Sequence, residues 1–417
     1  MPLAYFLGVS LIHVPGAALY SDSEDMRPVA VWSQMGFAQT TIGMVAFAVG
    51  VAVARYIARR RSAKFASPDV VARQDFTTVN RLATLYLWIG GAAYFVFLPV
   101  LGRVASLAAM LGPLGSLLLV GACLRLYVAR QLNDGGKYWS TIALLPVLPA
   151  STVIQAGFLN FGTSWALTIA SFVYAQSKRR LGLFLLTPVV IYIGLSVFVD
   201  YMNVRADIRK VVWRQDSFAA RVQVVENSIL SHFSWFDIAN PKHRQAINDR
   251  LNQNLWVGRA KQRLEEGQVS YAYGSTIQDM IMGLIPRAIW PDKPVVGGGG
   301  DVVSHYTGFI LDRTTSWGAG QVLEFYVNFS TLGVIGGFLL WGWLLGTGDF
   351  LIIKYLDQGD QARVLFWFLL CLSLMHPEGN LLEIFVGAIS AGVVASGVNF
   401  MLYRRRSAQA VPSLPRA

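Results

Sequence analysis

The chain has 417 residues, of which 54% are hydrophobic and only 14% are charged. Because a soluble domain usually carries about 25% charged residues, this composition excludes an ordinary water-soluble fold and favours a membrane protein. A net charge of +11 would suggest a nucleic-acid partner in a soluble protein. Here most of the excess lies in short loops between apolar blocks, where it sets membrane orientation, so no nucleic-acid partner is expected.

The apolar blocks predict an all-α polytopic membrane protein with about ten spans. Each block is close to the ~20 residues that a helix needs to cross the hydrocarbon core. In chain order, the predicted spans are 3–20, 30–54, 82–102, 105–128, 139–156, 160–177, 181–200, 320–346, 362–377 and 380–402. The first span lacks a basic region before it and a small-residue cleavage site after it, so we do not expect a cleaved signal peptide.

Lys and Arg residues in the short loops predict the orientation. With ten spans, five basic clusters fall on one side of the membrane: 55–81, 125–137, 178–180, Lys354 with Arg363, and 404–406. The positive-inside rule then places both termini in the cytoplasm and segment 201–318 on the extracytoplasmic side. The predicted organisation is therefore transmembrane helices 1–7 in 1–200, a large extracytoplasmic loop with amphipathic helices in 201–318, transmembrane helices 8–10 in 319–406, and a disordered cytoplasmic tail in 407–417.

The positive-inside rule does not govern a loop as long as 201–318, so its basic residues need another explanation. Some of them lie in mixed-charge helical stretches and are interpreted as solvated helix faces, namely Arg209, Lys210, Lys261 and Arg263. The stretch from Arg250 to Arg259 differs, because its two terminal arginines flank a plausible buried face that contains Trp256.

The segment GSTIQDMIMGLIPRAIWPDKP predicts an amphipathic helix at the membrane interface. The helix starts near Ser275 or Thr276, and Pro286 ends or kinks it. Arg287, Trp290 and Lys293 follow between three prolines, which stiffen the backbone. Rigidly held cations at a membrane surface suit an anionic lipid headgroup or a pyrophosphate.

Candidate acids and bases are few. His305 is a possible general base near neutral pH, although an ordinary surface histidine explains it equally well. Glu324 lies one helical turn before Asn328 at the start of a span, where a carboxylate must face a polar cavity or a partner. The same reasoning applies to the HPEGNLLE segment between the last two spans, with His376, Glu378 and Glu383; a structural bond to a loop arginine is the alternative for all three carboxylates.

The sequence has no metal-ligand motif, and its glycine run 297–300 lacks the Lys-Ser/Thr of a phosphate-binding loop. The two cysteines, Cys123 and Cys371, lie within apolar runs and support neither a disulfide framework nor a metal site. We therefore expect no metal and no cofactor, and chemistry that depends on arginines, lysine, and a carboxylate or histidine.

The run from Arg250 to Gly333 resembles the Wzy-like polymerases of bacterial O-antigen, capsule and exopolysaccharide repeat units. The Arg250-Leu251 helix, the block ending in IPRAIWPDKP, the loop through His305 and the GQVLEFYVNFSTLG entry into the next span carry this resemblance over about a fifth of the chain. It implies a fold similar to the GT-C glycosyltransferases, a place in a bacterial inner membrane, and a periplasmic, catalytic role for the 201–318 loop. It also implies transfer of a growing glycan from undecaprenyl pyrophosphate to an incoming lipid-linked unit, with a flippase and a chain-length regulator as expected partners.

Site residues follow from this reaction. The pyrophosphate candidates are Arg250, Arg287 and Lys293, with Arg259 and Arg244 as weaker ones. Glu324 or His305 would accept the proton of the attacking hydroxyl. Aromatic side chains would stack on sugars, with Tyr273, Trp290 and Trp317 as candidates, and the surface near Met280 and Leu284 would receive the prenyl chain.

Three other functions stay open. An O-antigen ligase-type enzyme has a similar topology and leaving group but a different acceptor. A flippase for lipid-linked glycans should carry polar residues along its spans, which the early spans here almost lack. A non-enzymatic scaffold of a polysaccharide complex would leave Arg287 and Lys293 without a catalytic purpose.

Overall fold

The structure is a computed structural model that describes residues 1–20, 27–65, 75–102, 105–178, 180–214, 218–227, 233–285, 290, 292, 298–310 and 318–409. These residues form helices and connecting turns, with no strand among them. The first half contains α1 (Pro2–Tyr20), α2 (Arg27–Phe65), α3 (Phe76–Ala92), the π-helix η1 (Ala93–Phe97), α4 (Leu98–Leu101), α5 (Ala105–Gly115), α6 (Leu117–Gln131), α7 (Gly135–Ile142), α8 (Val147–Ala156), α9 (Leu159–Gln176) and α10 (Arg180–Trp213). The second half contains α11 (Phe218–Val225), α12 (Pro241–Arg250), α13 (Asn254–Glu265), α14 (Ser275–Leu284), α15 (Gly299–Thr307), α16 (Gly320–Asp357), α17 (Gln361–Leu374) and α18 (Leu381–Gln409).

Eight helical stretches within the described residues are long and apolar enough to cross a membrane. They are Pro2–Tyr20, Arg27–Arg60, Phe76–Leu101, Met110–Gln131, Gly135–Ala156, Arg180–Val212, Gly320–Asp357 and Leu381–Leu402. This set confirms the predicted class, an all-helical polytopic membrane protein.

Two of the ten predicted spans do not belong to this set. The span predicted at 160–177 forms α9, whose Thr163, Ser164 and Thr168 line an internal cavity and make the helix less apolar. The span predicted at 362–377 forms α17, which has only 14 residues. At about 1.5 Å per residue, that helix is shorter than the hydrocarbon core.

Several helices end elsewhere than predicted. The helix predicted to leave the membrane at residue 200 continues as α10 to Trp213, which is 13 residues into the predicted loop. The helix α16 continues to Asp357, and its backbone is interrupted at Phe329 and Ser330. The helix α14 starts where predicted, but Gly274, with φ of 93°, precedes it in place of a serine or threonine cap. The helix α18 reaches Gln409, three residues into the predicted tail; residues 410–417 lie outside the described part.

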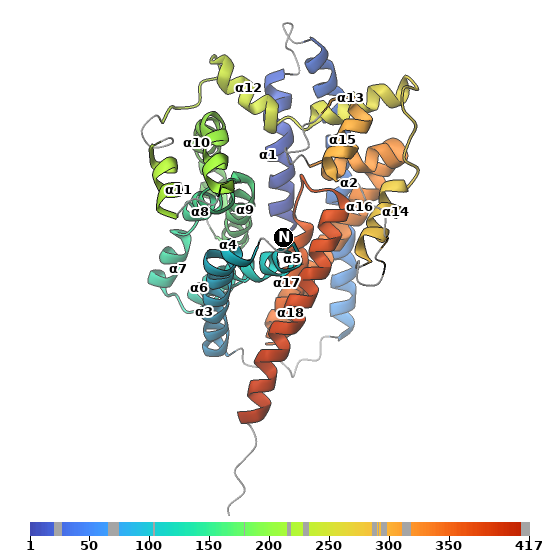
Figure 1. The fold of residues 1–417 in the computed structure, drawn as a ribbon. Coiled ribbons are helices and arrows are strands. Elements are labelled where there is room, and N and C mark those ends of the chain that lie inside the picture. The colour runs from blue at the N-terminus through green and yellow to red at the C-terminus, as the bar shows by residue number, and fades with distance from the viewer. Residues whose placement is uncertain are drawn as a thin grey trace, which may run out of the picture.

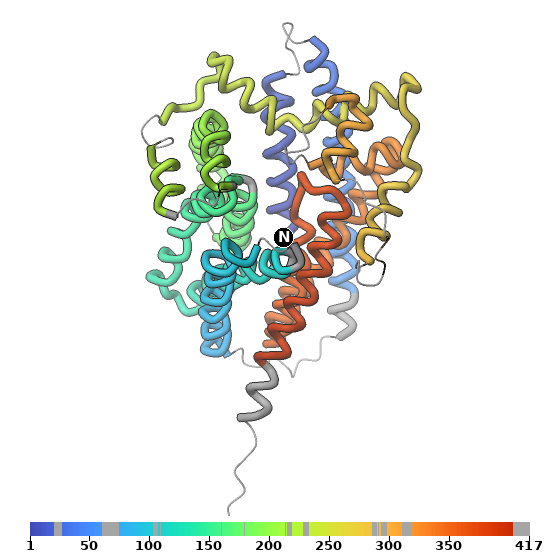
Figure 2. Tube along the Cα trace, in the orientation of Figure 1, coloured from blue at the N-terminus to red at the C-terminus, as the bar shows by residue number. Residues whose placement is uncertain are grey.

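The helices form two groups that meet along one side (Figure 1). In one group, α2 packs along α16, and α17 and α18 lie against each other; in the other, α3 packs on α6, and α8 on α9. The groups contact each other through α5 on α18 and α6 on α17. At the top of the view, α12 runs from α10 to α1 and so bridges the two groups (Figure 2). This arrangement leaves the space for a cavity between the groups.

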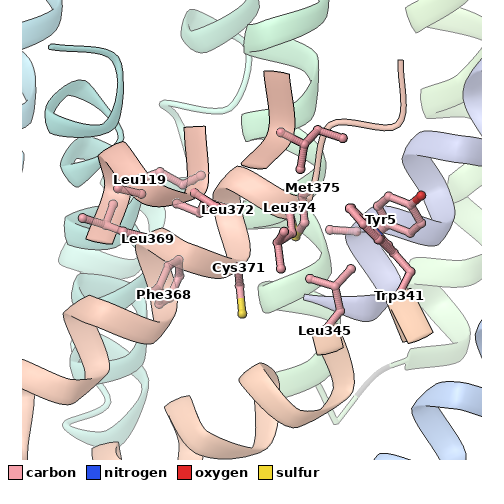
Figure 3. Packing of buried hydrophobic residues seen from close by; sticks show 14 of the residues in the cluster. Tyr5, Leu119, Trp341, Leu345, Phe368, Leu369, Cys371, Leu372, Leu374 and Met375 are labelled. Carbon is pink, nitrogen blue, oxygen red and sulfur yellow. The ribbon is translucent and has the colours of Figure 1, made fainter. Parts of the chain in front are cut away.

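The helix α17 is short because protein surrounds it. Its Phe368 and Cys371 are buried in the main core together with Leu119 of α6 and with Tyr5 and Leu345 of α1 and α16 (Figure 3). Both cysteines are free and buried, as the sequence analysis expected of apolar positions. A helix packed on several sides does not need to match the bilayer thickness by itself.

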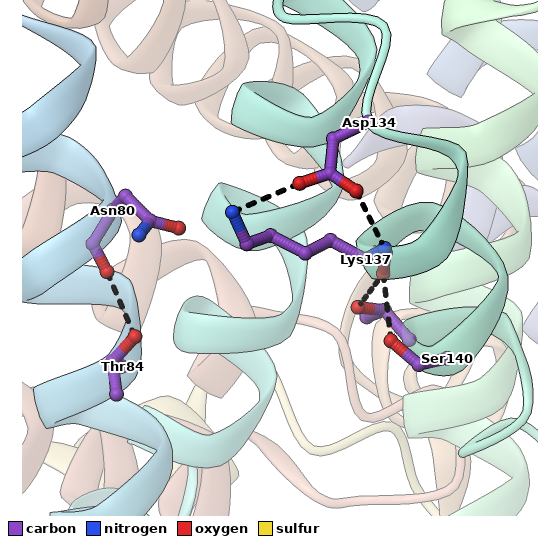
Figure 4. A network of polar contacts seen from close by, with 6 residues as sticks. Asn80, Thr84, Asp134, Lys137 and Ser140 are labelled. Atoms are coloured by element: carbon purple, nitrogen blue, oxygen red, sulfur yellow. Dashed lines mark hydrogen bonds and ion pairs between the residues drawn. The ribbon is translucent and has the colours of Figure 1, made fainter.

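The turn before α7 shows how one basic loop is organised (Figure 4). Asp134 caps this helix by accepting a hydrogen bond from the backbone N–H of Lys137 at 3.0 Å. The same carboxylate pairs with the Lys137 ammonium at 2.9 Å. Lys137 thus contributes to the local fold as well as to the charge of the loop.

Candidate functional site

A cavity of about 1030 Å³ lies between the two helix groups. One part of its wall is apolar and comes from η1, α4, α5 and the start of α9, with Tyr94, Leu98, Pro99, Pro113 and Phe161. The other part is charged and comes from α10, α11, α12 and the α17–α18 connection, with Arg205, Arg209, Arg221, Arg250, Glu378 and Glu383. The lining therefore suits a ligand that has both an anionic group and an apolar chain.

The arginines on α10 owe their place to helical periodicity. Arg205 and Arg209 are four residues apart, so their side chains leave the same face of the helix. Arg209 is fixed from two directions: its Nε donates to the carbonyl oxygen of Gly157 at 3.3 Å, and its guanidinium lies 4.5 Å from the ring centroid of Phe158. The hydroxyl of Tyr201 donates to the same carbonyl at 2.8 Å.

This packing corrects one interpretation of the sequence. Arg209 was interpreted as part of a solvated helix face, but the turn between α8 and α9 covers it and it lines the cavity. Lys210, the next residue, points the other way; it is exposed and pairs with Asp207 at 3.0 Å. The mixed-charge stretch therefore has one buried face, with Arg209, and one solvated face, with Lys210.

Arg250 stands at the C-terminal end of α12, where the chain turns toward α1 and α2. Burial lowers the pKa of Arg250 to about 10, and the nearby charges of Arg205 and Arg209 act in the same direction, while Glu378 opposes them. Arg250 is still a cation at neutral pH. Arg205, Arg209 and Arg250 repel one another in this cavity, and a bound anion would reduce this repulsion.

Glu378 and His376 come from the turn between α17 and α18. Burial raises the pKa of Glu378 to about 7, and the charge of Arg250 limits this rise. Burial lowers the pKa of His376, so the imidazole is neutral at neutral pH. A carboxyl group that titrates near neutrality is suited to accept and release protons under physiological conditions.

Hydrogen bonds to α16 fix this turn. The side chain of Gln321 donates to the carbonyl oxygens of His376 at 2.7 Å and of Gly379 at 2.9 Å, and it accepts from the hydroxyl of Tyr5 at 2.8 Å. The backbone N–H of Gly320 donates to the carbonyl oxygen of Glu378 at 3.1 Å. The Glu378 side chain therefore projects into the cavity from a rigid support.

The segment after Arg250 is anchored to the membrane helices by buried polar groups. The amide of Asn254 donates to the carbonyl oxygen of His13 at 2.7 Å, and its oxygen lies 2.6 Å from the His13 Nδ1. The hydroxyl of Thr40 donates to the same oxygen at 3.2 Å. Gly36 allows the close approach, because a Cβ there would lie 2.0 Å from the carbonyl oxygen of Asn254.

The structure brings four predicted candidates to the cavity: Arg250, His376, Glu378 and Glu383. Several others lie elsewhere. Arg244 lies over the ring of Tyr20, with 5.9 Å between its guanidinium carbon and the centroid. Arg259 donates to the carbonyl oxygen of Thr307 at 3.3 Å and covers Trp32 at 4.9 Å, and so holds α13 to its neighbours.

The predicted base His305 and two of the predicted sugar-binding aromatics, Tyr273 and Trp290, also do not line the cavity. His305 is on an exposed face of α15, and Tyr273 and Trp290 are exposed as well. Three further candidates, Arg287, Lys293 and Trp317, lie outside the described residues.

Glu324, the other predicted base, is 2% exposed and lies away from the cavity lining. Its Oε2 accepts a hydrogen bond from the backbone N–H of Leu381 at 2.7 Å, which caps the start of α18. On the next turn, the side chain of Asn328 accepts from the N–H of Gly274 at 2.9 Å and donates to the hydroxyl of Thr276 at 2.7 Å. This face of α16 thus holds α14 and α18 through backbone and hydroxyl groups, with no arginine among the described residues bonded to it.

Arg205, Arg221, Asp249 and Trp165 line the cavity and were not singled out from the sequence, and Trp256 was interpreted only as part of a buried face. One signal could have identified the first of them. Arg205 and Arg209 follow an apolar span at a four-residue spacing, which places two cations on one helix face at the end of the span.

No protein-family model, curated protein or solved structure matches the chain.

Proposed function

We propose that the chain is a glycosyltransferase of a bacterial inner membrane that polymerises polyprenyl-pyrophosphate-linked oligosaccharides at the periplasmic face. The observation that carries this proposal is one cavity whose lining combines several arginines with a large apolar surface. The resemblance of the run from Arg250 to Gly333 to Wzy-like polymerases supports the same function and a fold similar to the GT-C class.

The arginine cluster suits a pyrophosphate leaving group. A sugar pyrophosphate breaks down readily once the negative charge that develops on the departing oxygens is stabilised. Arg205, Arg209 and Arg250 would supply fixed positive charge and several N–H donors for this purpose. Fixed guanidinium groups can serve where other enzymes use a divalent cation, so we expect the transfer to be independent of added metal.

The apolar wall suits the prenyl chain. It forms where α3 changes to the π-helix η1 and then to α4, so that Tyr94, Leu98 and Pro99 face the cavity. A π-helix inside a longer helix often marks a functional site, because its extra residue reshapes the helix surface. Trp165 and Trp256 also line the cavity and would provide the flat apolar surfaces on which sugars stack, in place of Tyr273 and Trp290.

The structure also bears on the flippase alternative. Polar residues do occur in the early spans, but His13 and Thr40 bond to Asn254 and do not line the cavity. Their role is to attach the 251–258 segment. A ligase-type enzyme would use the same leaving group with another acceptor, and the product of the reaction distinguishes the two.

The test is complementation in a strain that lacks this gene, combined with an assay of the purified protein. The purified protein in nanodiscs is incubated with lipid-linked repeat units isolated from the deletion strain, with EDTA, and the products are resolved as a ladder. Wild type should form the ladder, and Arg205→Ala and Arg250→Ala should lose it. Arg244→Ala is the matched control, since it removes an arginine from the same helix as Arg250 but outside the cavity, and it should retain the ladder. Absence of a ladder from folded wild type, or equal ladders from all variants, would contradict the proposal.

A further inference from the structure

Glu378 is placed differently from the other carboxylates of the cavity. Asp249 accepts a hydrogen bond from Gln245 on the exposed surface of α12 at 2.6 Å. Glu383 is exposed on the first turn of α18. Glu378 is partly buried, stands on a turn that α16 holds in place, and is influenced by the charge of Arg250. Asp249 also acts on the cluster, through Arg205, so partial burial and a rigid support set Glu378 apart.

This position matters because of where the reacting carbon must lie. If the proposed function is correct, the anomeric carbon of the donor is bonded to the pyrophosphate, and the pyrophosphate is held by the arginines. The attacking hydroxyl must then approach on the opposite side of that carbon, within a few ångströms of the cluster. A general base has to reach this hydroxyl by a hydrogen bond or through one water.

We infer that Glu378 is the general base of the transfer and that Arg250 links it to the bound donor. The hydroxyl oxygen of the acceptor sugar forms the new bond to the anomeric carbon, and its proton passes to the Glu378 carboxylate. The bond between this carbon and the pyrophosphate oxygen breaks, and its electron pair leaves with the polyprenyl pyrophosphate. This single displacement inverts the configuration at the anomeric carbon.

Arg250 couples the strength of the base to the binding of the donor. Without a bound donor, the Arg250 charge favours the ionised form of Glu378 and so makes it a weaker base. A pyrophosphate on the arginine cluster offsets this charge and adds negative charge nearby. Both changes raise the proton affinity of Glu378, so the base becomes stronger as the donor binds.

Other charged groups also act on this carboxylate. The cavity receives Arg205 and Arg209 from α10, Arg221 from α11 and Asp249 from α12, together with His376 and Glu383 from the connection to α18. Among the described residues of the lining, four arginines stand against two carboxylates other than Glu378, which is an excess of positive charge. Neutral His376 changes this balance only when it is protonated at low pH.

The experiment compares Glu378→Gln with wild type in two assays that separate binding from transfer. Glutamine keeps the size of the side chain but cannot accept the proton. We expect Glu378→Gln to lower the rate of polymerisation about 10²- to 10⁴-fold, while undecaprenyl pyrophosphate binds as tightly as to wild type or more tightly, because a negative charge has been removed. At low donor concentration, where the free enzyme sets the pH dependence, the wild-type rate should rise with pH through about 7. At saturating donor the rise should occur at higher pH, and the residual rate of the variant should lose this dependence. Glu226→Gln, at an exposed position outside the cavity, is the control and should behave as wild type.

Each failure has a distinct signature. Glu378→Gln with nearly wild-type activity would overturn the assignment, and so would weakened binding in this variant or retention of configuration in the product. A glycosylated Glu378 peptide would show a nucleophile in place of a base. If wild type neither forms polymer nor binds undecaprenyl pyrophosphate, the proposed function itself fails.

Discussion

The attachment of the 251–258 segment to α1 and α2 makes a quantitative prediction about Asn254→Ala. Asn254 is fully buried, and its side-chain amide forms hydrogen bonds with the carbonyl oxygen and the ring of His13 and with the hydroxyl of Thr40. Removing the amide eliminates these bonds and leaves the His13 ring without its closest partner. Thr40 loses less, because its hydroxyl also bonds to the carbonyl oxygen of Gly36 at 3.2 Å.

The expected cost follows from these contacts. A net loss of about 1 kcal/mol for each hydrogen bond, together with a poorly satisfied buried donor, gives about 2–4 kcal/mol. A difference of about 1.4 kcal/mol changes an equilibrium tenfold. The detached state of the segment should therefore become about 30- to 700-fold more populated. Because Asn252 and Gln253 line the cavity, this detachment should also reduce activity.

Alkylation of a cysteine placed at Val257 would measure this population. Val257 is 1% exposed, and the native Cys123 and Cys371 are buried, so background labelling should be slow. When opening and closing are fast, the labelling rate is proportional to the open fraction. Asn203→Ala, at an exposed position on α10, is the matched control. A labelling rate in Asn254→Ala within about threefold of the control would refute the reasoning, since it corresponds to less than about 1 kcal/mol.

Four further outcomes are expected. Gly36→Val should detach the same segment, because the Cβ would lie 2.0 Å from the Asn254 carbonyl oxygen, whereas Gly91→Val, where a Cβ meets nothing within 4 Å, should not; the same alkylation assay compares them. The melting temperature of wild type relative to Glu378→Gln should fall as pH rises from about 4.5 to about 7, because the raised pKa means that the folded state holds a proton which the unfolded state has released; parallel curves would contradict this sign. Arg209→Lys keeps the charge but loses the contact with Phe158 and the fixed hydrogen bond, so undecaprenyl pyrophosphate should bind about tenfold more weakly, and unchanged titration curves would refute this. EDTA should leave polymerisation by wild type unchanged, and inhibition that added Mg²⁺ or Mn²⁺ reverses would refute metal independence.

Hydrophobic block length predicted most of the helices correctly, because a bilayer imposes a nearly fixed length on any helix that faces it on all sides. The rule failed for α9 and α17, where its premise does not hold. The polar residues of α9 face an internal cavity, and α17 is enclosed by protein. Neither environment is visible in a hydropathy average.

The site was predicted in part, and the errors have a common cause. Glu378 and Glu383, with His376, were recognised as groups that need a partner or a polar cavity, and Arg250 was a pyrophosphate candidate; all four line one cavity. Glu324 met the same criterion but caps α18. A buried carboxylate needs donors of some kind, and sequence alone does not distinguish backbone N–H groups from substrate or arginine.

Composition and the spacing of apolar blocks by themselves determined that this protein is a bundle of membrane-crossing helices with a polar segment late in the chain. Only the tertiary structure decided which cations share a cavity. Arg205 and Arg209 are about 40 residues from Arg250 in sequence, and Glu378 is more than 120 residues beyond it. They come together because α12 bridges the two helix groups and α16 holds the turn that carries Glu378. Contacts of this kind depend on which helices pack together. The apolar pattern within one helix does not indicate which other helices it will contact.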